Sequence, residues 1–328
     1  MSRRCSTTVL EVISPSVFTT VQDAGRRGWQ AFGVPVSGPM DAFAHRAANL
    51  LAANLPEAAA LEIGYTSAEF LACDDCLIAA TGPGFALSVN DRPMQMWTSV
   101  YVRKNRRIRL DKHGHGNWAY LSAHGGIQTP LILASRSSYI PARLGPSPLA
   151  PGDVLTTCPA GGGAGKSRAW LPGLAARALK STINYSPNPT IHILPGPQHA
   201  HFAPRTLCES AYTISPTSDR TGYRLIGPKL ERLVHGELLS EGMARGCIQI
   251  PPDGQPIVMQ ADCPTTGGYP KIASVIAADQ PLLAQVPVGM GQIRFQETTI
   301  EQAQSAYREM VNGLKTGIIH PASEEYCW

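Results

Sequence analysis

The chain has 328 residues, of which 43% are hydrophobic and 16% charged, and 28 Lys and Arg against 24 Asp and Glu give a formal net charge of +4. A charge this small on so long a chain excludes the strong positive field of a nucleic-acid-binding protein. No stretch approaches the roughly 20 apolar residues of a membrane span, and residues 1–10 contain no signal-peptide run, so we expect a cytoplasmic protein without membrane contacts.

The first half of the chain is predicted to be mostly β with one good helix. With 31 Gly and 28 Pro, the composition is typical of short strands joined by tight turns. Residues 41–51 form the helix, because Asp41 can cap its first turn and Phe43 and Ala47 share one face. β-favouring runs predict strands at residues 9–13, 76–80, 99–102, 106–110, 118–123 and 154–157.

The length predicts two domains, because it exceeds what one hydrophobic core usually serves. The stretch from Pro159 to Gly165 has no hydrophobic period and marks the boundary. We therefore expect a first domain over 1–165, a linker over 166–189 and a second domain over 190–328. The second domain is predicted to contain a late helix at 299–310, with Ile300, Ala303 and Tyr307 on one side, and strands at 190–194, 212–214, 247–250, 257–260 and 292–295.

Two motifs resemble known sites but lack the required context. Residues 160–167 nearly fit a phosphate-binding loop, but the first position is Ala and Pro172 interrupts the helix that such a loop must open. Cys73 and Cys76 have the spacing of half a zinc site, yet no second pair completes four ligands. We predict a flexible linker at the first motif, a turn between strands at the second, and no metal site.

Several turn-rich polar segments are candidates for a binding site. In the second domain, Asp219, Arg220 and Tyr223 crowd a Gly-containing turn, and residues 265–271 combine hydroxyls, free backbone N–H groups and an ammonium. A structural Asp–Arg turn is the plain alternative for the first segment, and loop or helix-cap roles are the alternative for the first-domain segments 22–26 and 33–41.

These segments carry a resemblance that extends over nearly the whole chain. Residues 20–26, 33–41, 61–63, 124–127, 194–198, 218–225 and 265–271 are similar to the KipA family, also known as the C subunit of 5-oxoprolinase, allophanate hydrolase subunit 2 or the carboxyltransferase A/B-domain family. The resemblance implies two cyclophilin-like β-barrel domains with a few short helices. Thr221 and Cys263 depart from the family pattern, which leaves open which amide or lactam is the substrate.

The resemblance also implies partners and a reaction. Members of this kind act with a KipI-like B subunit together with an A subunit in a heteromeric complex that uses ATP, with Mg²⁺, to open 5-oxoproline to glutamate. The alternatives are the carboxyltransferase component of a biotin-dependent urea or amide carboxylase, and a non-catalytic antagonist of KipI that regulates a histidine kinase. No biotin is expected on this chain, because it has no Met-Lys attachment motif.

Opening a resonance-stabilised lactam requires cations and amide donors around developing negative charge. We therefore assign Arg220, Lys271 and the Gly267-Gly268 backbone to phosphate or oxyanion binding. Asp219 and Glu241 are assigned to orienting substrate or moving a proton, although either could instead hold Arg220. Asp219, Arg220, Glu241, Tyr269 and Lys271 are predicted to surround one cleft of the second domain. The predicted substrate-binding or ATP-binding residues are Tyr223, Thr265, Thr266, Gly267, Gly268, Tyr269, Gln22, Asp23, Arg26 and Ser37.

Overall fold

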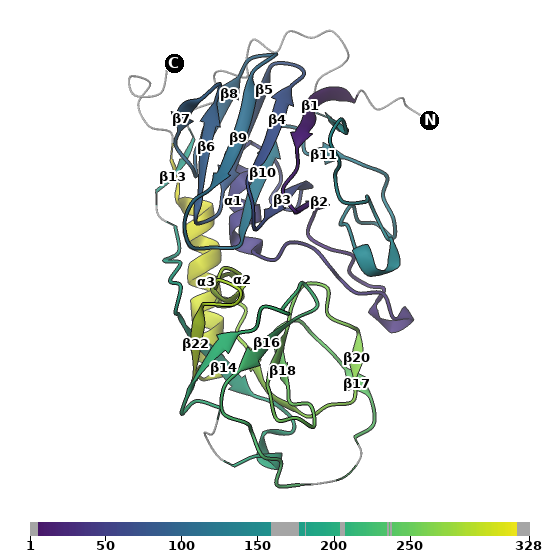
Figure 1. Ribbon diagram of the computed structural model, residues 1–328, viewed down its shortest axis with the longest axis vertical. Coiled ribbons are helices and arrows are strands. Elements are labelled where there is room, and N and C mark those ends of the chain that lie inside the picture. Colours follow the sequence, from purple (N-terminus) through teal and green to yellow (C-terminus); the bar gives the residue numbers. More distant parts are fainter. Residues whose placement is uncertain are drawn as a thin grey trace.

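The computed structural model describes residues 6–158, 177–180, 182–203, 207–234, 236 and 238–319. Strands dominate these residues (Figure 1), which confirms the mostly-β prediction. None of the helices in this part of the chain has the length and apolar character needed to cross a membrane. The phosphate-loop-like segment 160–167 lies outside the described residues.

The strands that precede residue 158 build two sheets. The larger contains β1 (Thr7–Ser14), β4 (Ala68–Ala72), β6 (Phe85–Val89), β7 (Arg92–Met94), β9 (Arg107–Lys112), β11 (Ile127–Gln128) and β12 (Val154–Thr157). The smaller contains β2 (Phe18–Gln22), β3 (Ala60–Gly64), β5 (Cys76–Thr81), β8 (Ser99–Val102) and β10 (Trp118–Ala123). Their orders are β11-β12-β1-β4-β9-β6-β7 and β2-β3-β10-β5-β8. All six runs predicted as strands in this half form strands.

The smaller sheet is buried on both faces, which explains why β3, β5 and β10 contain no exposed residue. Successive side chains of a strand point to opposite faces. Ala119 and Leu121 of β10 therefore join the core between the two sheets, whereas Trp118 and Tyr120 lie in a second core that also contains barrel residues. The first domain and the barrel therefore share this second core.

Helix α1 (Ala42–Leu51) covers the outer face of the smaller sheet. Its first turn is capped as predicted, because an Asp41 carboxylate oxygen accepts a hydrogen bond from the Ala44 backbone N–H at 2.8 Å. Phe43 and Ala47 are buried against the C-terminal helix, where Leu314 joins their cluster.

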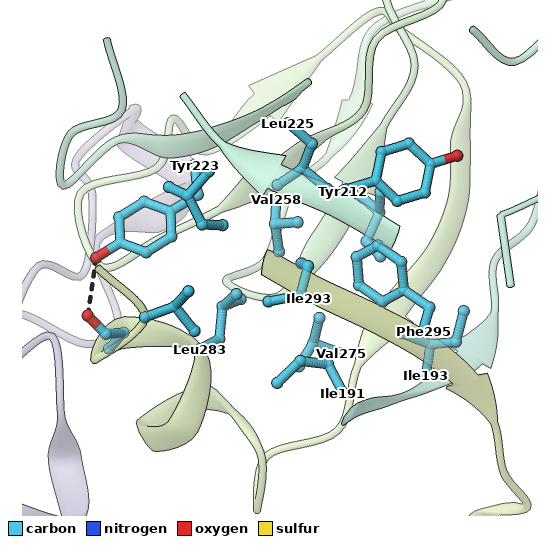
Figure 2. Close-up of a cluster of buried hydrophobic side chains, with 14 of the residues drawn as sticks. Ile191, Ile193, Tyr212, Tyr223, Leu225, Val258, Val275, Leu283, Ile293 and Phe295 are labelled. Carbon is cyan, nitrogen blue, oxygen red and sulfur yellow. Dashed lines mark hydrogen bonds between the residues drawn. The ribbon is translucent and has the colours of Figure 1, made fainter. Parts of the chain in front are cut away.

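The second domain is a closed barrel with the order β14-β21-β18-β19-β16-β15-β22. Figure 2 shows its core, in which the Tyr223 ring lies at one edge and its hydroxyl donates to the Ala284 carbonyl at 2.9 Å. The five predicted strands all form. The elements are β14 (Thr190–Pro195), β15 (Ala211–Ile214), β16 (Gly222–Ile226), β18 (Cys247–Gln249), β19 (Ile257–Met259), β21 (Lys271–Val275), β22 (Gln292–Glu297), the ladder β17 (Glu241–Gly242) with β20 (Thr266–Gly267), and α2 (Gln280–Ala284).

Helix α3 (Ile300–Thr316) extends six residues beyond its predicted end and lies beside both domains (Figure 1). Thr299 and Gln302 form a capping box at its start. The side that carries Ile300 is not the buried one, because Ile300 is 59% exposed and the buried residue of the helix is Leu314, near the other end. The face that contacts α1 is set by where the helix docks, which its own periodicity does not specify.

The described part of the predicted linker is not a free connection. Strand β13 (Ala178–Leu179) pairs with β23 (Ile318–Ile319), which follows α3. Further on, the Tyr185 hydroxyl donates to Asp41 at 2.7 Å, and its ring stacks on Trp97. Residues 177–180 and 182–189 therefore tie the C-terminal helix and the first domain together.

Candidate functional site

A cleft of about 370 Å³ lies between the first domain and the barrel. The first domain contributes the loop before α1 and part of α1 itself, and the second contributes the residues around β17 and α2. Helix α3 adds Tyr307 and Met310. Its polar lining consists of Arg27, Gln30, Ser37, His45, Arg46, Arg245, Thr265, Gln280 and the Tyr307 hydroxyl, with the Cys263 thiol beside them.

Three arginines line this cleft, and none of its described lining residues is Asp or Glu. The Arg245 guanidinium donates to the carbonyls of Pro39, at 2.8 Å, and Met40. Both acceptors are neutral, and in the described part of the chain none of Arg27, Arg46 and Arg245 forms an ion pair. Because unpaired cations attract anions most strongly where water is partly excluded, the cleft suits a negatively charged ligand.

Behind the cleft, Arg220 joins the two domains through a buried ion triad. Its Nε and Nη2 donate to the Asp262 carboxylate at 2.8 and 3.0 Å, and its Nη1 donates to Glu62 of β3. The exposed fractions are 5% for Arg220, 0% for Glu62 and 5% for Asp262. Burial alone would lower the pKa of the Arg220 guanidinium, but the carboxylates of Asp262 and Glu62 outweigh it and raise that pKa.

The triad also positions the loop that forms one wall of the cleft. Arg220 Nη2 donates to the Gly38 carbonyl at 2.7 Å, and the Ser37 hydroxyl donates to Asp262 at 2.6 Å. Glu62 accepts hydrogen bonds from the Met40 backbone N–H and the Tyr120 hydroxyl, both at 2.7 Å. Burial raises the pKa of Glu62, and the Arg220 charge opposes that rise.

The predicted ligand-binding residues Gln22, Asp23 and Arg26 form hydrogen bonds within the protein, and the Gln22 amide donates to the Ser138 carbonyl at 3.2 Å. Asp23 accepts hydrogen bonds from the backbone N–H groups of Gly25 and Arg136 and from two serine hydroxyls, at 2.6 to 2.9 Å. Burial would raise the pKa of Asp23, but these four bonds together lower it. Arg26 is fully buried and donates to two carbonyls of the loop 131–138.

Gly25 allows two backbone segments of this wall to approach closely. Its φ is +93°, and a Cβ there would lie 2.8 Å from Val36 Cγ1 and 2.9 Å from the Val36 carbonyl oxygen. Gly28 has nearly the same φ, +91°, with nothing within 4 Å of the position of an added Cβ.

Gly28→Ala is expected to cost about 1–2 kcal/mol of unfolding free energy through φ strain alone. Gly25→Ala should cost about 1–3 kcal/mol more, because the clash adds to the strain; equal losses in urea unfolding of the two variants would contradict this packing.

A second polar cluster lies on the barrel rim, where Lys271 Nζ is 2.6 Å from a Glu241 carboxylate oxygen. Gln198 donates to Glu241 at 3.3 Å and accepts from the Lys271 backbone N–H at 3.0 Å. The hydrogen bond from Lys271 is the main cause that lowers the pKa of Glu241. The β17–β20 ladder connects this cluster to the cleft, because the Met243 N–H donates to the Thr265 carbonyl and both residues line the cleft.

Comparison with known proteins assigns the fold to a family. Residues 32–297 match the family described as the carboxyltransferase domain, subdomain A and B. The chain belongs to this carboxyltransferase family. It is 35% identical over 309 residues to the C subunit of 5-oxoprolinase from Escherichia coli and 31% identical over 310 residues to that from Haemophilus influenzae. Each alignment covers 92% of this chain and 95% of the relative.

Larger members of the carboxyltransferase family contain this unit as one part. The crystal structure of TTHA0988 is 32% identical and superposes with a TM-score of 0.79, but this chain spans only 55% of it. The structure of the Kluyveromyces lactis urea carboxylase has a TM-score of 0.81 at 25% identity, with 97% of this chain and 30% of that chain covered.

Within the family fold, the predicted catalytic residues lie away from the interdomain cleft. None of Asp219, Arg220, Glu241, Tyr269 and Lys271 lines the interdomain cleft. Asp219 holds its own turn, accepting from the Thr221 N–H at 2.8 Å, and Arg220 faces the first domain rather than solvent.

The binding residues predicted from the carboxyltransferase resemblance are also divided. Ser37 and Thr265 line the cleft. Tyr223 is buried in the barrel core. Thr266 and Gly267 form the ladder that joins the cleft to the rim cluster, where Gly268 and Tyr269 follow.

Sequence reasoning missed Glu62, Asp262 and the three arginines of the cleft. Glu62 had a readable signal, because a carboxylate inside the apolar run Ala60–Gly64 must be paired if it is buried. Arg27, Arg46 and Arg245 had none, since each lies in an ordinary polar context and only folding brings them together.

Proposed function

We propose that this chain is one subunit of an ATP-dependent 5-oxoprolinase and works with two others, a KipI-like B subunit plus an A subunit. The names of the bacterial relatives, which this chain matches over 95% of their length, support the subunit role. The observation that carries the proposal for this chain is the cleft with three unpaired arginines. 5-Oxoproline bears one carboxylate on a small lactam ring, and a cationic cleft without acids suits such a substrate.

The cleft also offers groups of the right kind for the lactam itself. Amide side chains of Gln30 and Gln280 and the Thr265 hydroxyl can donate to the lactam oxygen and accept from its N–H. Tyr307 and Met310 of α3 provide apolar surface for the ring. In this proposal, the arginines bind and orient the carboxylate of the substrate. The amide and hydroxyl donors stabilise the negative charge that develops on the lactam oxygen as the C=O bond loses double-bond character.

The interdomain cleft does not fit a site for Mg²⁺ with ATP. Mg²⁺ prefers carboxylate oxygens, and none of the described lining residues of the cleft supplies one. The described part of the chain also contains no group of three or more His, Cys, Asp or Glu arranged for a metal ion. We therefore propose that another member of the complex binds ATP, and we assign no step of its chemistry to this chain.

Removing the Arg46 guanidinium is expected to weaken substrate use by the reconstituted complex. Arg46→Ala should lower kcat/KM for 5-oxoproline by about tenfold to hundredfold, the worth of a hydrogen-bonded charged contact. The measurement is 5-oxoproline-dependent ATP turnover with both of the proposed partner subunits present. Arg92→Ala, an exposed arginine on β7, is the matched control. Wild-type kinetics for Arg46→Ala would contradict this use of the cleft.

The second candidate is the carboxyltransferase component of a biotin-dependent carboxylase. It is favoured by the superposition on the Kluyveromyces lactis urea carboxylase over 97% of this chain. The same purified complex distinguishes the two, because a carboxyltransferase requires a biotin-carrying protein and bicarbonate, whereas an oxoprolinase turns over ATP without either. If the chain changes only the activity of its KipI-like partner, it is instead a regulatory binding protein.

A further inference from the structure

The cationic groups of the interdomain cleft come from three separate segments of the chain. Arg245, from the second domain, is anchored on the Pro39 and Met40 carbonyls just before α1. Arg46 lies four residues into the cleft-lining helix after Ala42, which places its backbone roughly 6 Å further along at 1.5 Å per residue. Arg27 lies on the loop that precedes the helix. One carboxylate accepts one guanidinium fork, so a single anionic group satisfies only part of this charge.

The size and polarity of the cleft are consistent with a ligand longer than a lone lactam. About 370 Å³ falls within the range of pockets that hold drug-sized ligands. Neutral hydrogen-bonding groups accompany the cations of both domains: Gln30 and Ser37 in the first, and Thr265 and Gln280 in the second. With no acid among the described lining residues, no negative charge in the described lining repels an anionic ligand.

We infer that the cleft binds a ligand with two anionic groups, one held by Arg245 and the other by Arg46 with Arg27. The class comprises small carboxylates that carry a second carboxyl or a phosphoryl group. This inference rests on the proposed function. It states that the cleft prefers a doubly charged derivative of the substrate amide over the amide itself, which carries a single charge. The two arginine positions act as specificity determinants, because each adds affinity only for a ligand that reaches it.

Titration calorimetry of the full chain with four small probes tests the inference. Glutarate and 4-phosphonobutyrate carry two anionic groups separated by three methylenes, and butyrate and propylphosphonate carry one. We expect both two-group probes to bind at least about tenfold more tightly than either one-group probe, since each charged contact contributes that much or more. The tighter of glutarate and 4-phosphonobutyrate identifies the second group as carboxyl or phosphoryl.

Variants of the two arginine positions must remove the advantage of the two-group probes. Arg46→Gln and Arg245→Gln should each reduce affinity for them to that of the one-group probes, while Arg92→Gln leaves it unchanged. Arg245→Lys keeps the positive charge at this position. Thermal unfolding of each variant shows whether the protein folds without the contacts from Arg245 to the two carbonyls. If Arg245→Gln unfolds, the Arg46→Gln and Arg245→Lys comparisons decide.

Equal affinities for the four probes, no binding, or an advantage that survives in Arg46→Gln would overturn the inference. The proposed function is judged separately by 5-oxoproline-dependent ATP turnover of the complex. Turnover without a two-group preference leaves the function standing and rejects the inference. A two-group preference without turnover rejects the function and keeps the binding class.

Discussion

Replacing Arg220 by alanine is expected to lower the free energy of unfolding by about 3–5 kcal/mol. The side chain contacts Glu62 and Asp262, and the substitution leaves both carboxylates buried between the domains without a positive partner. The loss also frees the Gly38 carbonyl and weakens the wall of the cleft. The sequence assigned Arg220 to phosphate or oxyanion binding, whereas the structure predicts that its removal affects folding.

Urea unfolding of the purified chain measures this loss. Arg224→Ala, four residues along the same segment, is the control, because its side chain is exposed and surface changes usually stay within about 0.5 kcal/mol. Adding Glu62→Gln and Asp262→Asn to Arg220→Ala should recover part of the stability by neutralising the unpaired charges. Normal stability of Arg220→Ala would show that the triad does not hold the domains together.

Acidification is expected to destabilise the fold through His45, by about 3 kcal/mol between pH 6.5 and pH 4. Burial lowers the pKa of His45 from 6.5 to about 4, so the folded state keeps the ring neutral while the unfolded state takes up a proton. Between these values the unfolded state binds more protons, and the free energy of unfolding falls as the pH falls. The contribution of His45 is complete above pH 6.5 and is lost progressively toward pH 4.

The difference between wild type and His45→Gln isolates this contribution from that of other groups. Asp23 has a lowered pKa, so its stabilisation is lost only at more acidic pH, below its ordinary value of 3.8. Burial raises the pKa values of Asp41 and Glu62, and protonation of these groups opposes the loss. Thermal unfolding at half-unit pH steps should therefore give a wild-type curve steeper than that of His45→Gln from pH 6.5 to 4; parallel curves would refute the assignment.

Short-range sequence patterns determined the helices and strands that form through interactions between neighbouring residues. A short apolar run between Gly-containing turns predicted the strand β10, and the Asp41 cap predicted the start of α1. Strands with weaker β signals, including β3 (Ala60–Gly64) and β16 (Gly222–Ile226), were missed. Their glycines and charged residues reduce intrinsic β preference, and they form because neighbouring strands supply their hydrogen bonds.

The site depended on contacts between distant residues, which only the tertiary structure decided. Arg220 and Glu62 are separated by 158 residues in the sequence, and their pairing depends on how the barrel docks on the first domain. A turn that contains Asp, Arg and Gly has the same local signals whether it faces solvent or another domain. Docking buried Arg220 and brought Arg27, Arg46 and Arg245 to one cleft. Whether a charged side chain forms an ion pair or faces a ligand depends on the groups that the fold places next to it.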